Sequence, residues 1–125
     1  MKKLKRKQLE NFQKSAHESF ERRALLHLRR DLNAVTAELR DEDLMAVVRQ
    51  AGALAKEYGL VTEVQTICFV DATILLGVRF ETKPNYEWAQ EILKSKVLGP
   101  QDRANLLLAT AFSVFRNEKG RKQVF

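Results

Sequence analysis

The sequence predicts an all-α protein, a single domain over residues 1–125 built as a bundle of about four to five helices. Two observations predict this class. Apolar residues recur at three- and four-residue steps along most of the chain, which is the spacing of one helix face. The 125 residues include only 5 Gly and 2 Pro, so few tight turns are expected, and the length suits one hydrophobic core.

A long first helix is expected over residues 4–30. Its basic first turns should project beyond the core, because a helix of this length spans roughly 40 Å. Residues 31–40 are expected to form a connector with room for one helical turn. The polar side of the helix, expected to face water, carries Lys14, Glu18, Glu21 and Arg22. The apolar side carries Leu9, Phe12, Ala16, Phe20, Ala24 and Leu28.

The second helix has the clearest signals. Asp41 is expected to be its N-cap, with Glu42 and Asp43 in the first turn, where acidic side chains favour the helix dipole. Gly59 is expected to end the helix in the left-handed conformation, and Leu60 to fold back on the last turn. The apolar stripe between these ends consists of Leu44, Val47, Val48, Ala51, Leu54, Ala55 and Tyr58.

Residues 62–80 fit two interpretations. Their many β-branched and aromatic residues would suit a hairpin that turns at Asp71-Ala72. Against the hairpin, the apolar positions do not alternate strictly, and Thr62 and Gln65 have the spacing of a capping box. We therefore predict a central apolar helix over 62–80. One of its faces would carry Asp71 together with Val64, Ile67, Cys68, Leu75 and Val78.

The remaining chain predicts two more helices. Residues 81–85 form a loop that contains Pro84, and residues 86–94 form a short helix. Pro100 suits the first position of the last helix, where its missing N–H is not needed. Beyond Arg116 the chain turns polar and is expected to fray. The short helix should bury Trp88, Ala89, Ile92 and Leu93, and the last helix Ala104, Leu107, Leu108, Ala111, Phe112 and Phe115.

Charge is concentrated at the two ends of the chain. Residues 1–31 hold ten Lys and Arg against four Asp and Glu, a net charge of +6, and the tail 116–125 holds four against one, +3. Residues 32–115 hold eight against eleven, −3. The segments 1–7 and 116–125 are therefore expected to be flexible and solvated, or to contact an acidic protein surface or nucleic acid. The candidate basic contacts are Lys2, Lys3, Lys5, Arg6 and Lys7.

The same composition favours a cytoplasmic protein. Cys68 is the single cysteine and cannot form an intramolecular disulfide. Polar residues follow the basic start where an export signal needs an apolar core. Charged residues interrupt the longest apolar region, 61–80, so no membrane span is predicted.

No residue pattern points to chemistry, so we predict a protein that is not an enzyme and holds no cofactor and no metal. His17 and His27 are ten residues apart and cannot share a helix face. Cys68 has no basic neighbour in sequence and is expected to be inert. The glycines are scattered, which excludes the usual phosphate loops. Nucleic acid is not favoured, because the basic ends lack interleaved aromatic residues.

A few residues are candidates for contact with a protein partner. Asp71 on an apolar helix needs a donor, such as Arg103, Arg79 or helix N–H groups, and otherwise would serve a pocket or a partner. Trp88 with Tyr86 suits either an interface or the core. The full candidate set is Asp71, Arg79, Tyr86, Trp88, Val124 and Phe125.

A set of short motifs resembles a pattern in small uncharacterised helical proteins of bacteria. These motifs are Lys56-Glu57-Tyr58-Gly59-Leu60, Thr62-Glu63, Leu76-Gly77-Val78-Arg79-Phe80, Trp88-Ala89 and Glu91-Ile92-Leu93. Such proteins are often encoded beside type VI secretion effectors and their spike or PAAR-type tip proteins. The resemblance covers about residues 8–108, and it leaves the basic ends outside.

The resemblance implies an adaptor or chaperone for a secretion effector or a spike or tip protein. Two alternatives stay open: an immunity protein that binds a toxin, and a nucleic-acid-binding protein that uses its basic ends. The oligomeric state is left open.

Overall fold

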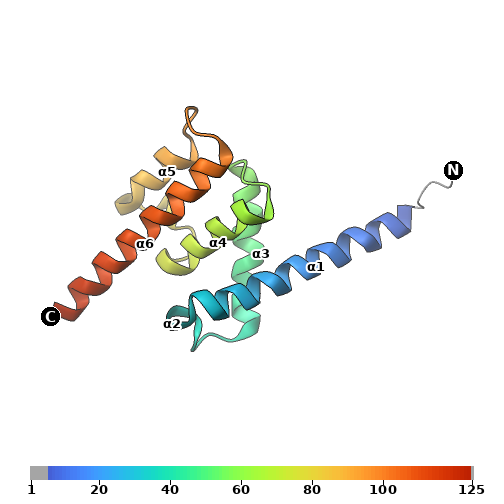
Figure 1. Ribbon diagram of the computed structural model, residues 1–125, viewed down its shortest axis with the longest axis horizontal. Helices are drawn as coiled ribbons and strands as arrows, with labels where there is room; N and C mark the ends of the chain where they lie inside the picture. The colour runs from blue at the N-terminus through green and yellow to red at the C-terminus, as the bar shows by residue number, and fades with distance from the viewer. Residues whose placement is uncertain (1–5, 125) are drawn as a thin grey trace.

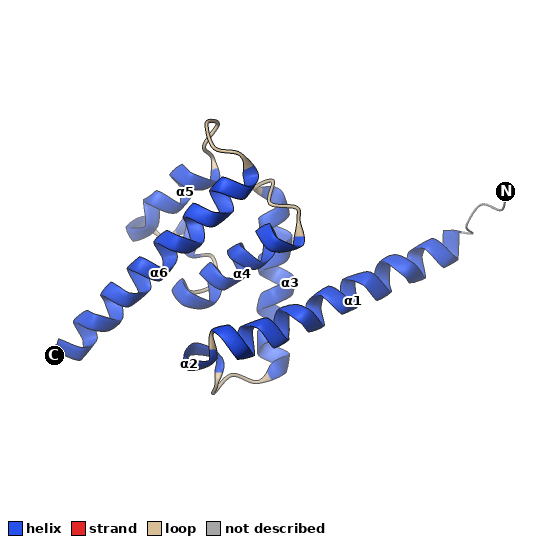
Figure 2. Cartoon of the chain, viewed as in Figure 1, coloured by secondary structure: helices blue, strands red, loops and turns tan. Residues whose placement is uncertain are grey.

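Helices make up all of the regular structure between residues 6 and 124. The computed structural model describes the backbone of these residues and the side chains of 8–11 and 13–118. Within that part of the chain no strand forms, which confirms the all-α class (Figure 2). Residues 62–80 accordingly hold a helix and no hairpin.

The long first helix, α1 (Arg6–Asp31), is anchored over its second half only. Ala24 and Leu28 are fully buried, whereas every described side chain from residue 8 to 18 is exposed. Figure 1 shows the first half projecting away from the other helices, as predicted. The connector holds a single turn, α2 (Asn33–Thr36). It is tied down where the buried Thr36 hydroxyl donates to the carbonyl oxygen of Leu32 at 3.0 Å.

The second helix, α3 (Asp41–Glu57), begins differently from the prediction. Arg40, with extended backbone angles, holds the N-cap position, so Asp41 as N-cap is wrong. The Asp41 carboxylate instead accepts from Arg29 Nη2 at 2.6 Å, which ties α3 to the end of α1. The other end is as predicted: Gly59 has φ +79°, and the Leu60 N–H donates to the Ala55 carbonyl at 2.9 Å.

The central helix, α4 (Glu63–Leu76), begins with the predicted capping box of Thr62 and Gln65. It ends four residues earlier than predicted, because Gly77 has φ +103° and Arg79 is left-handed at φ +58°. The predicted face is also wrong in part. Cys68 and Leu75 are buried, whereas Val64 is 62% exposed and Val78, 45% exposed, lies beyond the helix.

Short turns replace the predicted loop after α4. Two 3₁₀ turns, η1 (Phe80–Thr82) and η2 (Pro84–Tyr86), lead into α5 (Glu87–Leu93). Ala89 and Leu93 are buried on α5, and Trp88 and Ile92 are half-buried. The last helix, α6 (Pro100–Val124), starts at the predicted proline. The helix continues past Arg116 to Val124.

The core lies around α4, which packs between α3 and α6. A row of aromatic rings crosses it, with centroids 6.0 Å apart for Tyr58 and Phe69, 5.6 Å for Phe69 and Phe80, and 6.5 Å for Phe80 and Trp88. Arg103 on α6 joins two helix ends, because its Nη1 donates to the carbonyl oxygens of Tyr58 and Leu93 at 2.7 Å each. None of the described helices is long and apolar enough to span a bilayer.

Candidate functional site

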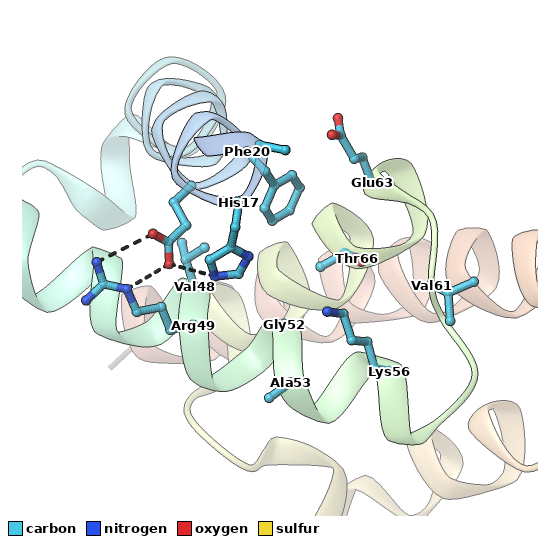
Figure 3. A pocket seen from close by; sticks show the side chains of 12 residues that line it. His17, Phe20, Val48, Arg49, Gly52, Ala53, Lys56, Val61, Glu63 and Thr66 are labelled. Atoms are coloured by element: carbon cyan, nitrogen blue, oxygen red, sulfur yellow. Dashed lines mark hydrogen bonds and ion pairs between the residues drawn. The ribbon is translucent and has the colours of Figure 1, made fainter. Parts of the chain in front are cut away.

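An open groove of about 580 Å³ lies where α1, α3 and the start of α4 meet. In Figure 3 Phe20 points from α1 into this space, and Thr66 faces it from α4. The floor is α3, where a Cβ at Gly52 would lie 3.7 Å from Thr66 Cγ2, an ordinary van der Waals contact between α3 and α4. The remaining lining comes from Ala16, His17, Glu21, Val48, Arg49, Ala53, Lys56, Val61 and Glu63.

The groove continues onto the projecting half of α1. Leu9, Ala16 and Phe20 follow one another at helix spacing, and we call these three residues the α1 stripe. Leu9 is 44% exposed and Phe20 half-buried, so the stripe runs from solvent into the groove. Val61, 67% exposed, adds apolar surface on the opposite wall. The combined surface is open, and its apolar side chains lie beside the charged groups of Glu21, Arg49, Lys56 and Glu63.

A buried carboxylate closes one end of the groove. The Glu21 side chain is only 4% exposed, and its Oε2 accepts from Arg49 Nε at 2.7 Å and lies 3.4 Å from His17 Nε2 (Figure 3). The prediction that Glu21 faces water is therefore wrong. Arg49, 28 residues away in sequence, supplies the opposite charge that offsets part of the cost of burying this carboxylate.

A second ion pair bridges the rim. Arg23 Nη2 lies 2.6 Å from Glu63 Oε1, which joins α1 to the first residue of α4. Both side chains are more than half exposed, so this ion pair contributes little to stability. It connects α1 with α4 at the edge of the groove. Lys56 lies on the α3 side and is exposed. Within the described part of the chain, Lys56 forms no ion pair.

Asp71 lies away from the groove, in the contact between α1 and α4. Its two carboxylate oxygens lie 2.9 and 2.8 Å from His27 Nε2, and the other ring nitrogen of His27 lies 2.9 Å from Asp31. The expected partners Arg103 and Arg79 are wrong, and the partner is His27 instead. Asp71 is 4% exposed, so its role in this structure is to hold α1 against α4.

Replacing Asp71 by asparagine is expected to change the pH dependence of stability. Burial raises the pKa of Asp71 above 3.8, against the hydrogen bond from His27, which lowers it. The folded state therefore binds the carboxyl proton of Asp71 more tightly than the unfolded state does. The contribution of Asp71 to stability accordingly falls as pH rises through the interval above 3.8.

Because Asp71→Asn removes this titration, the wild type should lose stability relative to the variant as pH rises through that interval. Urea unfolding of both proteins at a series of pH values measures the difference. A difference that stays constant with pH would contradict the assignment.

The other predicted contact residues do not gather at the groove. Tyr86 is 6% exposed and its hydroxyl donates to Glu118 Oε1 at 2.7 Å. Burial, and after it this hydrogen bond, raises the pKa of Tyr86 to about 12. Trp88 packs on Phe80, and Arg79 is exposed at the turn after α4. The side chains of Lys2, Lys3, Lys5, Arg6, Lys7, Val124 and Phe125 lie outside the described residues.

Sequence analysis missed the groove residues that carry charge. The spacing of His17 and Glu21, one turn apart and beside Phe20, was the one local signal of a polar contact on this face. Nothing local places Arg49 or Lys56 opposite them. Among the described residues, no group of three His, Cys, Asp or Glu side chains could hold a metal ion. Cys68 is buried, and this burial raises the pKa of its thiol.

Comparison with protein-family models, with curated proteins and with solved structures finds no match.

Proposed function

We propose that this protein is a non-catalytic, cytoplasmic protein-binding module that acts as an adaptor or chaperone for a type VI secretion effector or a spike or tip protein. The observation that carries the proposal is the groove between α1, α3 and α4, which opens onto the α1 stripe. The resemblance of the motifs between residues 56 and 93 supplies the secretion partner.

The shape of this surface suits a protein partner. An enclosed apolar cavity suits a small ligand, whereas this groove is open and continues along a helix that projects from the body (Figure 1). Amphipathic segments of partner proteins bind such grooves through apolar residues at helix spacing. A partner laid along the α1 stripe would also cover Leu9, which the fold leaves exposed.

Filling the groove is expected to abolish partner binding. Ala53 is exposed and lines the groove, so an indole at this position, in Ala53→Trp, would occupy the space without disturbing a buried side chain. The chain is co-expressed with type VI effector, spike and tip proteins, and the complexes are separated by size-exclusion chromatography. We expect one of them to co-elute with the wild type and to be lost, or bound at least about tenfold more weakly, with Ala53→Trp.

Ala109→Trp is the matched control, because Ala109 is an exposed alanine on α6 that does not line the groove. This variant should co-elute as the wild type does. Co-elution with none of these proteins, or equal loss in both variants, would contradict the proposal. An adaptor should raise the solubility of its partner, whereas an immunity protein should block a toxin's activity without that gain.

A further inference from the structure

The acidic groups of the groove are already paired. Glu21 is buried and bound by Arg49, with His17 beside it, and Glu63 is bound by Arg23 across the rim. Neither carboxylate is left to attract a basic partner. An incoming chain would therefore meet these acids as neutralised pairs.

Positive charge remains after this pairing. Lys56 stands exposed at the groove without an ion pair in the described part of the chain. The Arg49 side chain, although 62% exposed, adds no net charge here, because it is paired with Glu21. The helix that forms one wall adds to this charge, because α1 carries seven Lys and Arg against four Asp and Glu. The field at the groove thus favours negative charge on a partner.

The walls favour a helical occupant over an extended one. They are formed by helices whose backbone groups are already paired within each helix, so an extended chain would find no sheet edge to join. A helix brings its own backbone hydrogen bonds and needs only an apolar stripe to lay against the walls. Along α3 the lining runs from Val48 to Lys56, about 12 Å or two helical turns.

These observations together define the partner's chemistry. We infer that the groove and the α1 stripe receive an amphipathic helix of the partner protein whose apolar face packs on Phe20 and Ala53 and whose polar face is acidic near Lys56. This inference rests on the proposed function and specifies the segment that binds.

A displayed peptide library tests the inference with the full-length chain. The peptides are helices with a fixed apolar face, and each position of the polar face varies between Glu and Lys. We expect selection on the wild type to enrich Glu over Lys at least about tenfold at the positions that border the groove. Binding of a selected peptide, followed by fluorescence anisotropy, should weaken as salt is added, because screening reduces the attraction.

Two charge-reversal variants and one groove-filling variant serve as controls. Lys56→Glu should remove or reverse the preference for Glu. Lys96→Glu makes the same change at an exposed lysine between α5 and α6, outside the groove, and should leave the preference as in the wild type. Ala53→Trp should abolish recovery of the peptides.

The outcomes separate this inference from the proposed function. If Ala53→Trp abolishes recovery but the wild type prefers Lys or neither charge, the acidic helix is wrong and the groove remains a docking site. If no peptide is recovered, or if recovery is unaffected by Ala53→Trp, both are wrong. A wild-type dimer by light scattering that Ala53→Trp returns to monomer would show that a second copy fills the groove, and would also overturn the inference.

Discussion

Phe69→Ala is expected to lower the free energy of unfolding by about 3–5 kcal/mol, one of the two largest effects among the substitutions considered. Phe69 is fully buried on α4, in the middle of the aromatic row, with its ring 6.0 Å from Tyr58 and 5.6 Å from Phe80. Truncation removes a large buried side chain and leaves a cavity that rings held from α3 and η1 cannot collapse to fill.

Chemical denaturation of the wild type and Phe69→Ala, followed by circular dichroism, measures this loss. Val97→Ala is the control, because Val97 is 94% exposed and its truncation should change stability by no more than about 0.5 kcal/mol. A loss below about 1 kcal/mol for Phe69→Ala would mean that the row is not packed as described.

Arg103→Met is the second large effect, with an expected loss of about 2–4 kcal/mol. The guanidinium of Arg103 donates to the carbonyl oxygens of Tyr58 and Leu93, which close the ends of α3 and α5. Methionine keeps an unbranched apolar stem but has no donor, so two partly buried carbonyls would lose their charged partner. The loss should therefore exceed that of a single neutral hydrogen bond.

Arg79→Met provides the comparison, since Arg79 is exposed and the substitution makes the same chemical change. Thermal unfolding and hydrogen exchange of the Gly59 and Lys94 amides would locate the damage in Arg103→Met at the two helix ends. Equal stability of the two variants would contradict the assigned role of Arg103.

Helix boundaries could be predicted where the signal is local. The side chains of Thr62 and Gln65 each accept a hydrogen bond from the backbone N–H of the other residue, within one turn. Gly59 supplies the positive φ that the end of α3 needs. Pro100 similarly marks the start of α6. The predicted end of the central helix at residue 80 was wrong. Apolar residues continue past Gly77, so the sequence pattern gives no sign of the left-handed turn that follows.

The contacts of the groove and of Asp71 were less predictable, because they join residues far apart in sequence. The sequence predicts that Asp71 has a hydrogen-bond donor as its partner. It does not identify His27 as that partner, because His27 is 44 residues away and no periodicity connects the two. Glu21 lies on the side of α1 that reads as solvent-facing, and only the approach of α3 buries it against Arg49. The groove exists only once three helices are placed together.

Because only the second half of α1 packs on the other helices, α1 should detach from them more easily than the rest of the fold unfolds. α1 packs mainly on α3, through its second half, while the aromatic row and the contacts between α4 and α6 do not involve it. Detaching α1 would thus break fewer contacts than global unfolding, and its amide hydrogens should exchange with solvent sooner than those of α4. A ligand that contacts α1 and α3 at the same time would hold these two helices together. Its binding should therefore slow the detachment of α1.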